Sequence, residues 1–123
     1  MKSLKSLVFL SFFVLAQCAN SDDSTISLSQ LENERQEILD YINGFDCTNN
    51  CNYIALGAKP CGGPREYLLF PSSVNLPQLQ EMVDGYHELD SLYNIQTGAI
   101  SDCAVVLPPE NIGCVNGDCI VID

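Results

Sequence analysis

The C-terminal stretch of the chain reads Gly113-Cys114-Val115-Asn116-Gly117-Asp118-Cys119-Ile120-Val121-Ile122. Asn116 and Gly117 favour a type I′ turn, because both central residues of that turn need a positive φ angle. Two short strands are therefore expected, one on each side of the turn, with Cys114 and Cys119 opposite each other. A bridge between these two cysteines is geometrically possible, since such a non-hydrogen-bonded pair brings the Cα atoms to about 4.5–5.5 Å.

A first helix is expected to begin near residue 27. Ser27 and Gln30 form a capping-box pattern, and Ile26 and Leu31 supply the apolar contact that accompanies it. Apolar residues then recur at spacings of three and four, a stripe that only Arg35 interrupts: Leu28, Leu31, Ile38, Leu39, Ile42 and Phe45. Gly44 is typical of a helix end.

A second helix is indicated by the same two signals. Asn75 and Gln78 predict the cap, with Val74 and Leu79 as the apolar pair. One face carries Leu76, Leu79, Met82, Val83, Tyr86, Leu89 and Tyr93, and the other carries Glu81, Asp84 and Glu88. We interpret the acidic row as a solvated face, because it lacks the converging loop oxygens that calcium requires.

Short β-inclined stretches at residues 52–56, 65–70 and 104–107 complete the pattern. The expected order is helix, two strands, helix, and three strands including the C-terminal hairpin. A chain of 123 residues has room for one domain. The fold class is therefore expected to be α+β, with two helices packed on a small, mostly antiparallel sheet that disulfides staple together.

The N-terminus has the pattern of an export signal. Lys2 and Lys5 precede an apolar run too short to remain as a membrane span, and Leu15-Ala16-Gln17-Cys18 follows. This junction resembles a bacterial lipobox, although Gln17 stands where a small residue is usual, and the resemblance implies lipidation of Cys18. The acids that follow resemble an outer-membrane export signal. Ordinary cleavage and free secretion is the alternative.

We accordingly expect a signal peptide and junction at residues 1–19, a disordered tether at residues 20–26, and one domain at residues 27–123. The expected location is the cell envelope, as an outer-membrane lipoprotein or on the cell surface, or otherwise the periplasm or the medium. The triacyl anchor implied by lipidation would hold the protein on a membrane.

Seven cysteines are present, and lipidation of Cys18 would leave six. An oxidising compartment favours three bridges among these six: Cys47, Cys51, Cys61, Cys103, Cys114 and Cys119. Cys61 with Cys103 is the favoured pair, because each lies in a turn-like segment. The spacings Cys-x3-Cys and Cys-x4-Cys would also suit zinc, but the compartment favours disulfides, so no metal or cofactor is expected.

The charge of the mature chain argues against nucleic-acid partners. Only Arg35, Lys59 and Arg65 remain as basic side chains outside the signal, three positive charges against sixteen negative ones, or a formal −13. Non-specific nucleic-acid affinity comes mostly from Lys and Arg that displace counterions, so this class of partner is excluded.

The mature part resembles a family of small exported, cysteine-rich bacterial proteins. The likeness rests on Lys59-Pro60-Cys61-Gly62-Gly63-Pro64, on Ser101-Asp102-Cys103, and on the terminal Gly117-Asp118-Cys119. It covers roughly residues 47–119. This family implies export and disulfides but no particular activity, so it assigns no catalytic residue.

The candidate binding residues are Lys59, Gly62, Gly63 and Arg65. Two glycines allow the backbone N–H groups to form a small anion-binding concavity, and two of the three cations flank them. The alternative is a simple turn whose cations pair with acids such as Glu66 or Asp102.

No catalytic residues are expected, because the only histidine, His87, lies beside the apolar stripe without a partner for a catalytic pair. The expected function is a non-enzymatic module that binds an envelope or extracellular protein. The alternative is a protease inhibitor that presents Arg65 or Lys59 on a disulfide-pinned loop.

Overall fold

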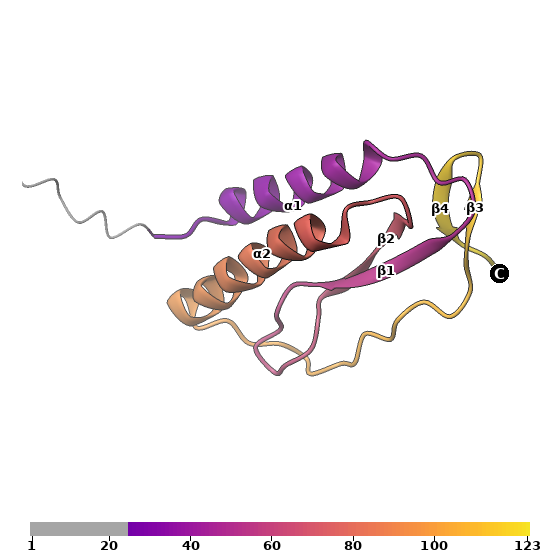
Figure 1. Cartoon of the computed structure of the whole chain (residues 1–123). Helices are drawn as coiled ribbons and strands as arrows, with labels where there is room; N and C mark the ends of the chain where they lie inside the picture. The colour runs from indigo at the N-terminus through magenta and orange to yellow at the C-terminus, as the bar shows by residue number, and fades with distance from the viewer. Residues whose placement is uncertain (1–24) are drawn as a thin grey trace, which may run out of the picture.

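The computed structural model describes residues 25–123. It contains two helices, α1 (Leu28–Asn43) and α2 (Leu76–Thr97), and four strands, β1 (Cys51–Leu56), β2 (Glu66–Pro71), β3 (Ile112–Val115) and β4 (Asp118–Val121). Figure 1 shows the helices side by side and antiparallel, next to the β1–β2 ribbon, with the β3–β4 hairpin across one end of that ribbon. The fold is α+β, as the sequence indicates.

Both helices begin as their capping residues predict. The Ser27 hydroxyl accepts a hydrogen bond from the N–H of Gln30 at 3.1 Å, and the Asn75 side chain accepts one from Gln78 at 3.2 Å. The α2 helix ends at Gly98, which adopts a left-handed φ of 61°. Leu28 and Leu76, expected on the buried faces, are exposed because each is the first helical residue and projects beyond the core.

The strands form two separate ribbons. β1 pairs with β2 in an antiparallel register that sets Ile54 opposite Leu68, and β3 pairs with β4 so that Cys114 is opposite Cys119. Asn116 and Gly117 have φ angles of 53° and 87°, which confirms the positive φ values predicted for this turn.

The prediction of a strand at residues 104–107 is wrong. These residues have no regular secondary structure and pair with no strand of the described chain. A strand needs a neighbour to satisfy its backbone, and Pro108 and Pro109, which follow, have no N–H to donate. This segment belongs to a longer irregular stretch, residues 99–111, which we call the return segment.

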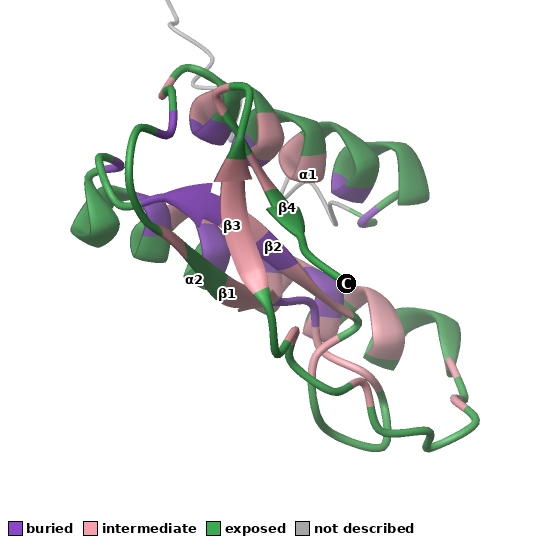
Figure 2. Cartoon of the chain, turned by 90° about the vertical axis from the view of Figure 1, so that its right-hand side faces the viewer, coloured by how far each residue is buried: buried purple, intermediate pink, exposed green. Residues whose placement is uncertain are grey.

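One apolar core lies between the helices and the inner face of the β1–β2 ribbon, where Figure 2 shows the buried residues. Its members come from all four of these elements and from their flanks: Ile26, Leu31, Ile38, Ile42, Leu56, Leu68, Phe70, Val74, Leu79, Val83 and Tyr86. Ile26, assigned to the tether in the sequence analysis, is buried, and its backbone exchanges two hydrogen bonds with the side chain of Gln96. The folded part therefore includes it.

Three disulfides close the structure. Cys61 is bridged to Cys103, as the sequence analysis favoured. Cys114 and Cys119 are not bridged to each other but to Cys47 and Cys51, respectively. We call the Cys47–Cys114 and Cys51–Cys119 bonds the hairpin bridges, because together they fasten the β3–β4 hairpin to the start of β1.

Candidate functional site

The connection between β1 and β2, residues 57–65, carries the four candidate binding residues, and we call it the stapled loop. Its tip is a tight turn, in which Lys59 N–H donates to the Gly63 carbonyl at 2.9 Å and Gly62 N–H donates to the Lys59 carbonyl at 2.8 Å. Gly62 and Gly63 have φ angles of 96° and 81°. The bridge from Cys61 to Cys103 fixes this tip to the return segment.

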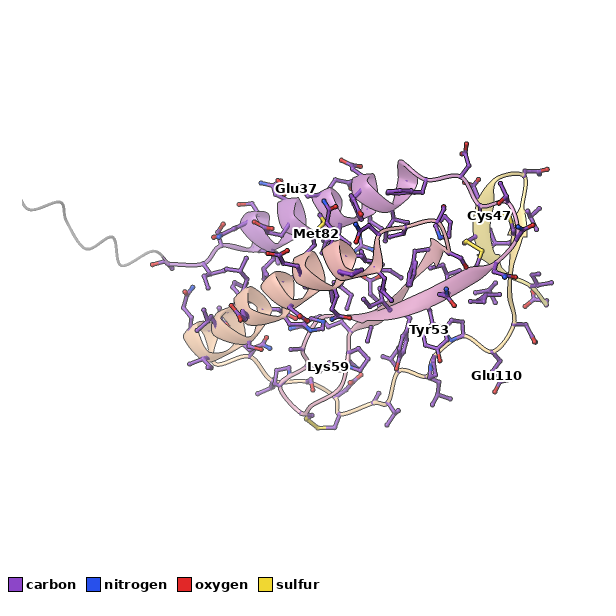
Figure 3. The ribbon with its side chains drawn as sticks, in the orientation of Figure 1. Glu37, Cys47, Tyr53, Lys59, Met82 and Glu110 are labelled. Atoms are coloured by element: carbon purple, nitrogen blue, oxygen red, sulfur yellow. A yellow bond between two sulfur atoms is a disulfide. The ribbon has the colours of Figure 1, made fainter. Side chains whose placement is uncertain are left out.

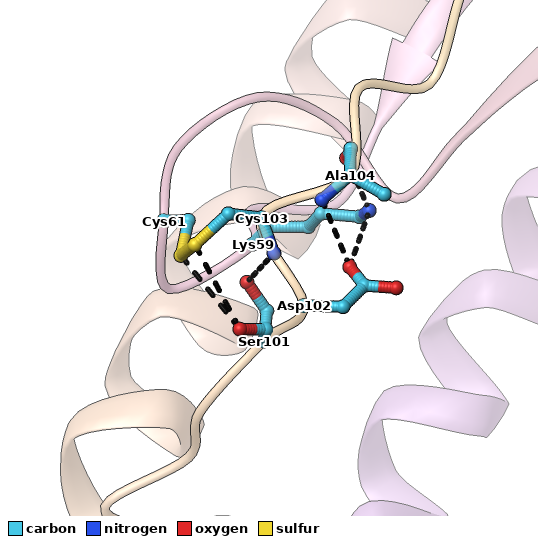
Figure 4. Close-up of a disulfide and its surroundings, with 6 residues drawn as sticks. All are labelled: Lys59, Cys61, Ser101, Asp102, Cys103 and Ala104. Carbon is cyan, nitrogen blue, oxygen red and sulfur yellow. Dashed lines mark hydrogen bonds and ion pairs between the residues drawn. A yellow bond between two sulfur atoms is a disulfide. The ribbon is translucent and has the colours of Figure 1, made fainter.

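Lys59 strengthens the same attachment. Its ammonium donates to the carbonyl of Ala104 at 2.8 Å and lies 3.6 Å from a carboxylate oxygen of Asp102, and its side chain is 14% exposed (Figure 4). The backbone N–H of Ala104 and then the Lys59 charge hold the pKa of Asp102 below its usual range. Lys59 therefore serves to hold two segments of the chain together.

Arg65 is also engaged within the chain. Its guanidinium donates to both carboxylate oxygens of Asp90, at 2.7 and 3.0 Å, and to the side-chain oxygen of Asn94 at 2.8 Å. The hydrogen bonds to Asp90 raise the pKa of Arg65. Ala58 completes the cluster, because its N–H donates to Asp90 and its carbonyl accepts from Asn94.

Asp90 is the structural residue that the sequence analysis missed. It is 1% exposed, the only buried polar or charged residue in the described chain. A signal was present, because Asp90 continues the buried stripe of Leu79, Val83 and Tyr86 at helical spacing. An acid in such a stripe needs a cationic or N–H partner, and the stapled loop supplies both.

The four predicted binding residues are thus close together but differ in what they offer a partner. Gly62 and Gly63 lie at an open tip, with nothing near the position of an added Cβ. Lys59 pairs with Asp102 and Arg65 with Asp90, so the cations meet acids of their own chain. Glu66 pairs with Arg35. Both cations that the inhibitor alternative would present to a protease are therefore engaged with acids of their own chain.

Beside the tip lies a hollow of about 450 Å³. Its lining comes from the stapled loop and the return segment: Cys61, Gly62, Gly63, Pro64, Cys103, Ala104, Val105 and Val106. Val105, which lines this hollow, is 81% exposed, and two other apolar side chains of the return segment, Ile100 and Leu107, are 94% and 76% exposed. Figure 2 shows most of this segment as exposed.

The backbone polar groups of residues 105–107, beside the hollow, are free to bind a partner. Within residues 25–123, no hydrogen bond involves the N–H or C=O groups of residues 105–107. Val105 and Leu107 are exposed while Val106 between them is half-buried, which is the alternation of an extended strand. The segment therefore offers apolar side chains and unpaired backbone together.

A smaller hollow of about 220 Å³ lies between the helices, where Arg35, Arg65, Tyr86, Asp90 and Tyr93 contribute to its wall. Arg35, which interrupts the apolar stripe of α1, is explained here by its two hydrogen bonds to Glu66 on β2. Burial raises the pKa of Tyr86.

His87 lies half-buried on α2, and its Nε2 atom has no hydrogen-bond partner among the described residues. Glu88, Ser91 and Leu92 surround it at an open surface. Glu81, Asp84 and Glu88 are exposed, as expected of a solvated face.

The four cysteines of the hairpin bridges are gathered at the opposite end of the ribbon from the stapled loop. Figure 3 shows Cys47 beside the β3–β4 hairpin. The sulfur atoms of Cys47, Cys51 and Cys119 all lie within 4.8 Å of one another, and that of Cys114 is bonded to Cys47.

The three disulfides indicate an extracellular or envelope location, because such compartments favour their formation. Neither described helix combines the length and the apolar character needed to span a membrane. Cys18 and the expected signal lie outside the described residues. Comparison of the chain with protein-family models, with curated proteins and with solved structures found no match.

Proposed function

We propose that this chain is an exported, lipid-anchored envelope protein that acts as a non-enzymatic binding module. Its partner is an extended, apolar segment of another envelope or extracellular protein. This segment docks along residues 105–107 and places a side chain in the hollow beside Gly62 and Gly63. The observation that carries the proposal is the exposure of Ile100, Val105 and Leu107 on a segment that a covalent bridge holds in place.

Leaving these apolar side chains in water is unfavourable. Several highly exposed apolar side chains on one short segment of a small domain are consistent with an interaction site. Here Cys103 and Lys59 restrain the segment, so little conformational entropy remains to be lost when a partner binds. A preformed, extended backbone with free N–H and C=O groups suits recognition by strand addition.

Charge defines the partner further. The mature side chains sum to a formal −13, so a strongly acidic partner would be repelled at long range. Pro108 and Pro109 cannot donate hydrogen bonds, which limits strand addition to the residues before them. The expected partner segment is therefore short, apolar and neutral or basic.

Capture from an envelope extract tests the proposal. Val105→Asp with Leu107→Asp should weaken capture at least tenfold without lowering the melting temperature, because both side chains are exposed. Leu92→Asp, at an exposed position on α2, is the matched control and should capture normally. Unchanged capture by the return-segment variant, or equal loss in the control, would refute this docking surface.

The anchor is tested separately. Palmitate labelling of cells that express the wild type and Cys18→Ala should label only the wild type. Two unlabelled products would leave free secretion as the mode of export. The docking surface and the lipid anchor involve different residues, so one proposal can be refuted without the other.

A further inference from the structure

Three of the four sulfurs of the hairpin bridges lie close enough together to bind one metal ion. These three are mutually within 4.8 Å, and the fourth, on Cys114, is bonded to one of the three. Tetrahedral zinc with Zn–S bonds of about 2.3 Å places neighbouring sulfurs about 3.8 Å apart. After reduction, the thiolates of Cys47, Cys51 and Cys119 would already lie near this spacing, and the freed Cys114 thiolate would have to move toward Cys51 and Cys119 to complete the set.

The backbone around the cluster is arranged as two short ligand-bearing turns. Cys47 and Cys51 flank the loop that enters β1, and Cys114 and Cys119 flank the Asn116-Gly117 turn. The two turns are joined without the sulfurs, because Cys47 N–H donates to the Gly117 carbonyl at 3.0 Å. Spacings of three and four residues between ligands on facing turns are typical of closed structural zinc sites.

We propose that the chain with reduced hairpin bridges binds one Zn²⁺ through Cys47, Cys51, Cys114 and Cys119. The metal then fastens the β3–β4 hairpin to β1 in the place of the two disulfides. The same four sulfurs thus hold the hairpin in two ways: through zinc–thiolate bonds before oxidation, and through two disulfide bonds in the oxidised chain. This inference is independent of the proposed docking surface.

Reduction and oxidation of the two bridges interconvert the disulfide state and the zinc-binding thiol state. A phosphine converts each bridge and one water molecule into two thiols and one phosphine oxide, so two bridges yield four thiols. Zn²⁺ then replaces the thiol protons, which pass to solvent, and binding is correspondingly weaker at low pH. Two equivalents of a disulfide carrier then re-form the two bridges: each carrier takes two electrons from a pair of thiolates and two protons from solvent, becomes a dithiol, and the metal is released.

The remaining bridge is an internal control. Cys61 and Cys103 are both exposed and form no part of the cluster of Cys47, Cys51 and Cys119. Two thiols alone cannot close a tetrahedral site. Replacing them should leave metal binding intact, whereas replacing Cys51 and Cys119 should remove half of the ligands.

The experiment uses the full chain carrying Cys18→Ala, reduced with a phosphine and freed of metal. Zn²⁺ should bind at one equivalent and raise the melting temperature, and Co²⁺ should give the spectrum of tetrahedral four-thiolate coordination. Cys61→Ser/Cys103→Ser should behave in the same way. Cys51→Ser/Cys119→Ser should lose the four-thiolate spectrum and bind at least a hundredfold more weakly.

Three outcomes would overturn the proposal. These are the absence of stoichiometric binding, binding without any rise in melting temperature, and loss of the spectrum in the Cys61/Cys103 variant instead of the Cys51/Cys119 variant. The oxidised chain serves as the blank and should bind no zinc at this position.

Discussion

Replacing Arg65 with Ala should destabilise the fold far more than a substitution of an exposed cation normally does. The Arg65 side chain is 40% exposed, but the side chain of Asp90, with which it pairs, is only 2% exposed. Arg65→Ala removes two hydrogen bonds from Asp90 and leaves the Ala58 N–H as its remaining partner. A buried carboxylate would then lack a counter-charge.

The magnitude follows from this asymmetry of burial. Removing one partner of a buried ion pair costs about 3–5 kcal/mol, because the remaining charge stays desolvated. Solvent already reaches part of Arg65, so water can enter once the side chain is gone, and we expect the lower end, about 3 kcal/mol. For a domain of this size, that loss lowers the melting temperature by roughly 10 °C or more.

Chemical denaturation of the oxidised protein at neutral pH measures this loss directly. Arg35→Ala is the matched control, because Arg35 makes a similar two-bond contact with Glu66, whose side chain is 36% exposed. An exposed pair contributes about 1 kcal/mol or less. Adding Asp90→Ala to Arg65→Ala should cost much less than Asp90→Ala alone, since the two residues act as one unit.

Equal losses for Arg65→Ala and Arg35→Ala would refute the reasoning, because burial of the acid would then make no difference. If Arg65→Ala instead keeps its stability and loses partner capture, the arginine is a contact for the partner, as the sequence first suggested.

Three further outcomes are expected. Gly57→Ala should cost about 3 kcal/mol, because Gly57 has a φ of 87° and an added Cβ would lie 2.7 Å from the Arg65 side chain, whereas Gly62→Ala, at a φ of 96° in open space, should cost only about 1 kcal/mol by denaturation. Tyr86→Phe should remove a loss of stability at alkaline pH: burial raises the folded pKa of this phenol, so the folded chain keeps its proton longer and stability falls as pH rises from about 10 through that pKa. Replacing one hairpin bridge with serines should cost about 3 kcal/mol, because with the other bridge in place it closes a ring of only about ten residues. Replacing both should cost about 7 kcal/mol, because a long loop of the unfolded chain is then also released. Strictly additive losses from the two bridges would contradict that argument.

Local signals in the sequence identified most of the secondary structure. Ser27 and Asn75 mark the starts of the helices, because a side-chain oxygen that accepts an end N–H acts within three residues. Asn116 and Gly117 mark the hairpin through an effect that is equally local, since the φ preference of a turn is a property of the residues in it. The strand expected at residues 104–107 failed, because a strand depends on a neighbour that the local sequence does not specify.

The number of disulfides and the pairing of Cys61 with Cys103 were also within reach of the sequence. The pairing of the other four cysteines was not. The hairpin register does place Cys114 opposite Cys119, yet Cys47 and Cys51 take both sulfurs. That choice depends on how the hairpin docks against the start of β1, which is a contact between residues more than sixty positions apart.

The sequence by itself determined that this chain is a small, acidic, cysteine-rich α+β domain, because composition, capping and hydrophobic period are local properties. Only the tertiary structure decided the role of its charges. In the folded chain Asp90 lies in the core and pairs with Arg65, which is 25 residues away in the sequence. A cation that looked available to a partner is therefore engaged in an ion pair within the fold. The tertiary structure also left Val105 and Leu107 exposed to solvent, in a segment where the sequence had suggested a strand. The reason is the same in both cases: burial is set by which segments pack together, and a residue's type limits that outcome without choosing it.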